Sequence, residues 1–218
     1  LYWLRQHEQE IVTDYAKLCS NYLPDDYIQN ATIHIVIGGY NGIAFDDRVC
    51  MNIDHPGFRA NYREIELYIA HEMFHIGFEK YHALPDIFAA RTVGDLREIV
   101  MSLTMNEGLA TLTPYHRRIT LDEISDSDYQ VLLNPDILAE KVRQFEVILQ
   151  YIDNNSHREL TGEILGKVLG PCSGDRLFYT VGCHMGLEIE RELGVSTIRN
   201  LAREGWHRFF EARRSMNP

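Results

Sequence analysis

Apolar positions along the chain follow a helical spacing in most segments and an alternating spacing in one short region. Residues 3–20 show the helical spacing, with one side of the expected helix formed by Leu4, Ile11, Tyr15 and Leu18. Pro24-Asp25-Asp26 interrupts this pattern. We therefore expect an amphipathic helix that ends shortly before Pro24.

The alternating spacing lies in residues 32–37, which are rich in β-branched side chains and predict a strand. The glycine-rich segment 38–42 follows as a turn or loop. Residues 43–45 and 48–53 then predict two more short strands around Asp46-Asp47. We expect these three strands to form a small antiparallel sheet.

Helical patterns fill the rest of the chain. Asn61, with Glu64 three residues later, marks the start of a helix over about 62–81. The next helix covers about 95–113 and ends at Pro114. Further helices are expected over about 134–153, 159–168 and 175–193, with a loop at 170–174 between the last two. Gly194 is the stop signal of the helix over 175–193. Two short helices are expected within 196–214.

These elements predict an α+β, predominantly helical fold, in which a small antiparallel sheet precedes the helices. The chain has 218 residues and no internal repeat, low-complexity segment or clear linker. We therefore expect one domain over residues 1–218. The sheet and the first helices would occupy about 31–113, and a helical C-terminal part about 120–218.

Composition and charge restrict the classes of partner that the chain is expected to bind. The chain is 45% hydrophobic and 24% charged, which is ordinary for a globular protein. Its formal net charge of −11 argues against nucleic acid, because binding phosphates needs clustered lysine and arginine. A basic or neutral substrate is compatible with this charge. No run of 18 apolar residues is present, so we expect no membrane-spanning helix.

Cysteine spacing favours free thiols. Cys19, Cys50, Cys172 and Cys183 form no CxxC pair, so neither a disulfide framework nor a cysteine zinc site is expected. Buried free thiols favour a reducing, cytoplasmic compartment. The N-terminus shows no basic segment followed by an apolar core, but it also lacks methionine. The chain is therefore compatible with a fragment that has lost an export signal.

The main chemical signal is the H-E-x-x-H motif formed by His71-Glu72-Met73-Phe74-His75. Histidines at i and i+4 of a helix share a face, so both imidazoles can reach one Zn²⁺ at about 2.0–2.1 Å. Glu72 would then lie beside the metal-bound water as a general base. The apolar residues around the motif indicate a buried helix, where unpartnered histidine and glutamate would be costly.

Two more ionisable residues follow on the same helix. Glu79 lies one turn and His82 two turns beyond His75. At about 1.5 Å per residue, His82 is about 10 Å along the axis and cannot share the zinc. We expect Glu79 and His82 to be solvated or capping residues.

A third zinc ligand is expected from the next strongly predicted helix. Glu107 lies in the segment Asn106-Glu107-Gly108-Leu109-Ala110, among apolar residues where an unpaired carboxylate would be unfavourable. Gly108 would allow the two metal-binding helices to approach closely. Glu98, on the same helix, is the competing ligand, but it follows Arg97 and fits a surface position. We expect one zinc per chain, bound by His71, His75 and Glu107.

The H-E-x-x-H motif followed by an N-E-G-x-A helix resembles the gluzincins, the thermolysin-like clan of zinc peptidases. The arrangement is most similar to the small zinc-dependent peptidases of that clan. The resemblance covers residues 31–113 well and 175–194 more loosely. It implies a sheet, a helix with His71, Glu72 and His75, and a second helix with Glu107. It also implies that a sheet edge within 42–53 binds an extended substrate by strand addition.

The sequence departs from the pattern of this clan in its motifs. Thermolysin has an aspartate four residues after the glutamate ligand, where this chain has Thr111, so the groups that orient the zinc histidines must differ. The G-x-M-E-N signature of the large aminopeptidases is missing, and so is the longer metzincin motif.

The resemblance further implies an oxyanion stabiliser, a tyrosine or histidine on a segment well after the glutamate ligand. Tyr179 and His184 both qualify. Tyr179 shares a helix face with Gly182, Cys183 and Gly186, a stripe of mostly small residues that allows close approach to the site. His184 lies about 140° around the helix from Tyr179. We therefore expect Tyr179 to be the stabiliser and His184 to be the second candidate.

The sequence therefore predicts a zinc-dependent hydrolase acting on a peptide or protein substrate. Two alternatives remain open: a zinc-binding sensor or interaction module without turnover, and an amidase on the same fold. Glu72 distinguishes the first alternative, because a module that only binds zinc has no chemical use for it.

Overall fold

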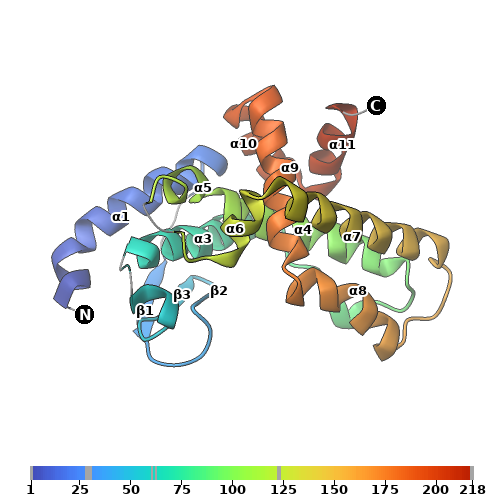
Figure 1. Ribbon diagram of the computed structural model, residues 1–218, viewed down its shortest axis with the longest axis horizontal. Helices are drawn as coiled ribbons and strands as arrows, with labels where there is room; N and C mark the ends of the chain where they lie inside the picture. Colours follow the sequence, from blue (N-terminus) through green and yellow to red (C-terminus); the bar gives the residue numbers. More distant parts are fainter. Residues whose placement is uncertain (1, 28–30, 60, 62, 122–123, 217–218) are drawn as a thin grey trace.

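The computed structural model describes residues 2–27, 31–59, 61, 63–121 and 124–216. Figure 1 shows a mostly helical molecule with a small sheet at one end. In chain order the described elements are α1 (Tyr2–Tyr22), β1 (Thr32–Val36), β2 (Gly42–Phe45), β3 (Arg48–Asn52), α2 (Pro56–Arg59), α3 (Arg63–Glu79), η1 (Ile87–Ala89), α4 (Asp95–Leu112), α5 (Tyr115–Arg118), α6 (Ser127–Leu132), α7 (Pro135–Asn154), α8 (Gly162–Gly174), α9 (Leu177–Leu193), α10 (Val195–Glu204) and α11 (Trp206–Met216). This arrangement confirms the predicted α+β, predominantly helical class.

Within the described residues, the sheet has three strands in the order β1-β3-β2. β2 and β3 pair antiparallel as a hairpin, with Ile43 opposite Cys50. β1 pairs with β3 in parallel, so the prediction of a purely antiparallel sheet was wrong. Gly38 and Gly39 have φ values of 95° and 81°, which allow the loop after β1 to carry the chain to the far edge. Alternating hydrophobicity alone does not specify which strands pair.

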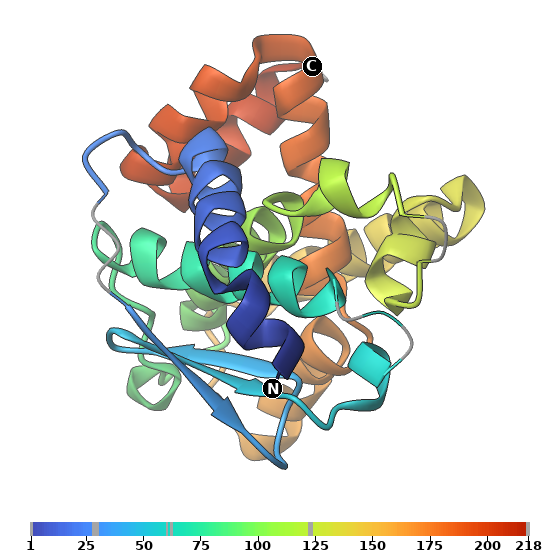
Figure 2. The same cartoon turned by 90° about the vertical axis from the view of Figure 1, so that its left-hand side faces the viewer.

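The inner face of the sheet packs against α3. Val49 and Met51 of β3 are fully buried there, and α3 contacts both β2 and β3. Figure 2 shows the sheet at the lower side of the molecule and the C-terminal helices at the opposite side. β2 is an edge strand of the described sheet, so one of its edges is left unpaired by other described strands.

α3 begins near its predicted start. The Asn61 side chain accepts a hydrogen bond from the backbone N–H of Arg63 at 3.0 Å. Residue 62, the first of the predicted helix, lies outside the described residues. The Glu64 side chain does not close a capping box with Asn61; it pairs with Arg118, whose Nη2 lies 2.9 Å from Glu64 Oε2. A long-range ion pair has therefore replaced the local contact.

The helix α4 runs through the core and crosses α9. A Cβ at Gly108 would lie 2.3 Å from the carbonyl carbon of Gly182, and one at Gly182 would lie 2.0 Å from Thr104 O. The backbones of the two helices are therefore in direct contact. Gly108 was expected to let α4 approach the H-E-x-x-H helix; instead it meets α9. The stripe predicted on α9 does face α4, because Gly186 meets Leu109 and Leu112.

Two parts of the helical region differ from the sequence prediction. Segment 170–174 continues α8 despite Pro171, because Ile164, Val168 and Cys172 form one buried stripe at i, i+4 and i+8. Four short helices of the described chain were not predicted, namely α2, η1, α5 and α6. Their three to six residues are too few to show a period.

No helix within the described residues combines the length and apolar character needed to cross a membrane. The four cysteines form no disulfide with one another; Cys19, Cys172 and Cys183 are buried, and Cys50 is half-buried.

Candidate metal centre

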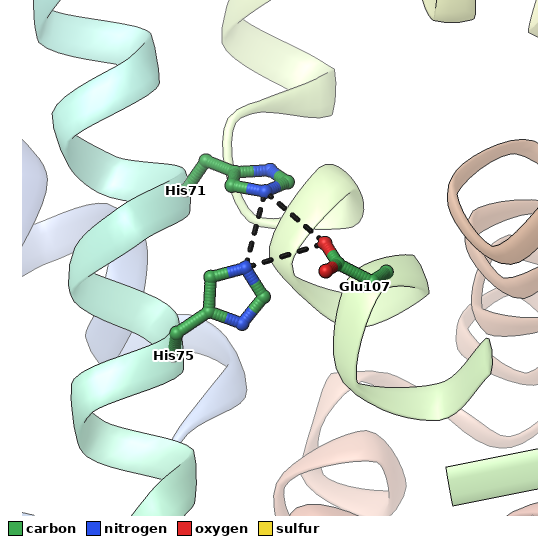
Figure 3. Close-up of side chains that lie close together, drawn as sticks. All are labelled: His71, His75 and Glu107. Carbon is green, nitrogen blue, oxygen red and sulfur yellow. Dashed lines mark hydrogen bonds and ion pairs between the residues drawn. The ribbon is translucent and has the colours of Figure 1, made fainter. Parts of the chain in front are cut away.

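His71, His75 and Glu107 lie together between α3 and α4 (Figure 3). The Nε2 atoms of the two histidines are 3.2 Å apart. Glu107 Oε2 lies 3.6 Å from His71 Nε2 and 3.3 Å from His75 Nε2. Ligands bound to tetrahedral zinc at 2.0–2.1 Å are separated by about 3.3 Å, so the three atoms already have the spacing of one tetrahedral face.

Hydrogen bonding through Nδ1 leaves the Nε2 atom of His75 available to bind a metal. His75 Nδ1 lies 2.9 Å from Asn106 Oδ1, which can only accept, so Nδ1 carries the proton. The Nε2 lone pair of the neutral ring is then directed toward His71 and Glu107. Such an outer partner for a zinc histidine is typical of zinc sites. Asn106 was not predicted to have a role, although it directly precedes Glu107.

Electrostatics also favour a cation between these three side chains. Burial lowers the pKa of His75, but the nearby Glu107 carboxylate outweighs this and raises it to about 9. Burial raises the pKa of Glu107, but the charge of His75 holds it well below its usual range. Within the described part of the chain, Glu107 Oε2 is buried without a hydrogen-bond partner. The donor set therefore fits a divalent metal, which would compete with protons for it.

The centre opens onto a cavity of about 410 Å³. Glu72 lies in its wall and is only 7% exposed. The neighbouring position on β2 is Gly42, where a Cβ would lie 2.9 Å from Glu72 Oε1. The absence of a side chain at Gly42 thus leaves room for the Glu72 carboxylate beside the ligands.

Of the two candidate oxyanion stabilisers, the structure brings only Tyr179 into this cavity. Its ring stacks on His71, with 6.2 Å between ring centroids and an interplanar angle of 12°. Burial raises the pKa of the Tyr179 phenol, and the charge of Glu107 adds to this effect, so the hydroxyl stays protonated. The hydroxyl is therefore a hydrogen-bond donor next to the three candidate metal ligands.

His184 lies away from the centre, contrary to its place as second candidate. It lines a separate groove of about 550 Å³ between α4, α7, α9 and α11. There His184 Nε2 is 3.5 Å from Glu188 Oε2, one turn along α9. Because His184 is about 140° around the helix from Tyr179, it faces the other side of α9.

Three other glutamate and histidine residues were assigned from the sequence as surface or capping groups. Glu98 lies in the first turn of α4 and is not one of the three clustered ligands. Glu79 is half-buried in the cavity wall, and His82 Nε2 is 2.9 Å from the Ala202 carbonyl oxygen. Glu79 is therefore only partly solvated, and His82 caps the C-terminal end of α10 rather than its own helix.

A charged wall on the other side of the cavity was not predicted. Arg118 is 2% exposed and lies 2.8 Å from Asp126 Oδ2, in addition to its pairing with Glu64. Its guanidinium also lies over the Tyr68 and Tyr129 rings, 4.7 and 4.3 Å from their centroids. Asp128 and Arg176 form a second ion pair next to it. No local sequence signal identifies these residues, because their partners lie on other elements.

The buried site of two imidazoles and one carboxylate, with a further carboxylate beside it, is typical of a zinc-dependent hydrolase. Residues 2–212 match the family model described as "Putative zinc dependent peptidase (DUF5700)", and the chain belongs to that family. The family assignment supports a zinc-dependent hydrolase with a peptide or protein substrate. No curated protein and no solved structure matches the chain.

Proposed function

We propose that the protein is a zinc metallopeptidase of the gluzincin type, with one zinc per chain bound by His71, His75 and Glu107. The observation that carries this proposal is the spacing of 3.2–3.6 Å between the three ligand atoms. A zinc ion bound there would lower the pKa of a water in its open position and polarise the scissile carbonyl.

Glu72 is the general base in this proposal. Its carboxylate takes a proton from the attacking water and passes it to the leaving amine nitrogen, so it ends the cycle ionised as it began. Its position in the cavity wall beside the ligands supports this role. A protein that only binds zinc would have no use for a second carboxylate at this point.

Tyr179 stabilises the charge that develops on the substrate carbonyl oxygen. The protonated hydroxyl next to the ligands can donate a hydrogen bond to that oxygen, and such donors are most effective in a site that excludes water. The substrate itself would lie along β2, because residues 41–44 line the cavity and β2 is an edge strand. Strand addition there would bind an extended peptide through its backbone.

The test is cleavage of a mixed peptide library by zinc-loaded wild type and by Glu72→Gln, with zinc content measured on the same samples. Wild type should cleave peptides, and Glu72→Gln should keep one zinc while losing at least about a hundredfold in rate. Glu98→Gln is the matched control on α4 and should keep both zinc and activity.

The remaining outcomes separate the alternatives. Zinc binding by wild type without any cleavage would favour a sensor or interaction module. Cleavage restricted to small non-peptide amides would favour an amidase. Full activity in Glu72→Gln would show that Glu72 is not the base.

A further inference from the structure

Arg176 has a backbone conformation that arginine rarely adopts. It directly precedes α9 and has φ 61° and ψ 30°, in the left-handed region. Asp46 is the other non-glycine residue with positive φ among those described. Side chains other than glycine are unfavourable in this region, and such conformations persist where surrounding contacts hold them. Contacts around the Arg176 side chain must therefore stabilise this conformation.

Asp128 of α6 holds the Arg176 guanidinium. Arg176 Nε is 3.1 Å from both carboxylate oxygens of Asp128, and Nη2 is 2.5 Å from Oδ2. The Asp128 side chain is only 5% exposed. A planar guanidinium held at two nitrogens by one buried carboxylate has a fixed orientation.

The fixed guanidinium lies directly over the Tyr179 ring. Arg176 Cζ is 3.4 Å from the ring centroid, within the range of a strong cation–π contact. Tyr179 in turn stacks on the metal ligand His71. Asp128, Arg176, Tyr179 and His71 thus form a continuous line of contacts from α6 to the metal centre.

The carboxylate that begins this line is itself well anchored. The side chain of Asp126 accepts a hydrogen bond from the backbone N–H of Asp128 at 2.9 Å and so caps α6. Asp126 also accepts hydrogen bonds from Arg118 and Tyr68, at 2.8 and 2.7 Å. Arg118 is therefore paired separately and does not compete for Asp128.

We propose that Asp128 and Arg176 are positioning residues that hold the Tyr179 ring so that its hydroxyl points at the substrate carbonyl. This inference rests on the proposed role of Tyr179 in peptide hydrolysis. Without the guanidinium over the ring, the tyrosine can rotate about its side-chain bonds, and the donor is no longer preorganised. The loss should appear in the chemical step more than in substrate or zinc binding.

The principal variant is Arg176→Gly, because glycine suits the left-handed backbone and the change removes only the side chain. In the zinc-loaded enzyme, kcat for a cleaved peptide should fall about tenfold or more, with KM within about twofold and zinc content unchanged. Arg176→Lys should not rescue kcat, because an ammonium has no planar fork. Arg97→Ala removes another arginine that pairs with an aspartate, and Arg97 is about as exposed as Arg176, so this control should leave kcat unchanged.

A double-mutant cycle distinguishes positioning from a general structural effect. If Arg176 acts through Tyr179, adding Arg176→Gly to Tyr179→Phe should cause no further loss in kcat. Asp128→Asn should behave like Arg176→Gly in both backgrounds. If Arg176→Gly lowers kcat as much in the Tyr179→Phe background as in wild type, the inference is overturned. It is also overturned if Arg176→Gly changes only KM, or if its kcat equals that of wild type.

A structural measurement tests the clamp without any turnover. In crystals of zinc-loaded Arg176→Gly, the Tyr179 side chain should leave its wild-type rotamer or become disordered. An unchanged, ordered Tyr179 would overturn the inference even if the protein cleaves peptides. A displaced Tyr179 in a protein that cleaves no peptide would instead contradict the proposed function alone.

Discussion

Asn106 is placed to orient His75, one of the proposed zinc ligands, through the 2.9 Å contact between its Oδ1 and His75 Nδ1. Asn106→Ala should weaken zinc binding about 10–100-fold, because the imidazole loses its hydrogen-bond acceptor. Asn106→Asp keeps an acceptor and should bind zinc nearly as well as wild type. Competition with a chromophoric chelator measures both affinities. Ser102→Ala, a buried polar change on the same helix, is the control, and an equal loss there would contradict the specific role of Asn106.

Gly42 offers a way to displace the proposed base without unfolding the protein. A methyl group at this position would lie 2.9 Å from Glu72 Oε1, 3.1 Å from its Cγ and 3.1 Å from Met51 Sδ. Both neighbours are flexible side chains that can shift, so Gly42→Ala should lower the melting temperature only modestly. Its kcat should fall about tenfold or more, because the carboxylate loses its position beside the ligands.

Gly57→Ala is the matched control for Gly42→Ala, because among the described side chains its methyl group would meet only that of His55, at 3.2 Å. Steady-state kinetics and thermal unfolding of both variants provide the comparison. Wild-type kcat in Gly42→Ala would show that Glu72 does not need its observed position.

The sequence predicts those site residues that lie close together along the chain. His71, Glu72 and His75 are within one helical turn, so their spacing alone predicts a shared site. Asn106 contacts a histidine 31 residues earlier, and Asp128 pairs with an arginine 48 residues later. Neither contact leaves a local pattern, because only the packing of α3, α4, α6 and α9 creates it.

At the level of elements, the crossing of α4 and α9 holds Glu107 and Tyr179 in one cavity. Gly182→Ala would place a methyl group 2.0 Å from Thr104 O on α4, so the helices would have to separate. We expect the free energy of unfolding to fall by about 1–3 kcal/mol or more, with weaker zinc binding. Urea unfolding of the zinc-loaded protein is the measurement.

Gly166→Ala on α8 is the matched control for Gly182→Ala, since no atom of the described residues lies within 4 Å of its Cβ position. Alanine there should stabilise the helix by roughly 0.5–1 kcal/mol, because glycine is a poor helix former. Equal effects of the two substitutions would mean that close packing at Gly182 is not required.

The sequence predicted the long helices well and the sheet and α8 less well. Asn134 and Gly194 mark helix ends correctly, because caps are local features. Strand order depends instead on where the Gly38-Gly39 loop carries the chain. The continuation of α8 past Pro171 depends on burial of Cys172, which only the neighbouring helices provide. Both differences arise where tertiary contacts outweigh local preference.

At the level of the whole molecule, the chain is acidic, and its cavity also carries an excess of negative charge. The formal net charge is −11. Among the described residues, the cavity wall contains the guanidinium groups of Arg118 and Arg176. It also contains the carboxylates of Glu72, Glu79, Glu107, Asp126 and Asp128. A bound divalent ion and the two guanidinium groups together would not neutralise all of these carboxylates. The resulting potential should attract cationic substrates.

Two peptides that differ only in flanking lysine or glutamate residues test this expectation. At low salt, the lysine peptide should have a kcat/KM about tenfold higher, because electrostatic attraction speeds its association. At about 0.5 M salt the difference should largely disappear, since screening shortens the range of the field. A preference for the glutamate peptide, or a ratio that is independent of salt, would contradict the electrostatic account.

The most direct test of the zinc centre is the position of the metal itself. Crystals of zinc-loaded protein should show an anomalous difference peak at the zinc edge between α3 and α4. The peak should lie about 2.0–2.2 Å from His71 Nε2, His75 Nε2 and a Glu107 carboxylate oxygen. A peak bound by other residues, or a Glu107 carboxylate beyond about 2.5 Å with another ligand in its place, would contradict the account.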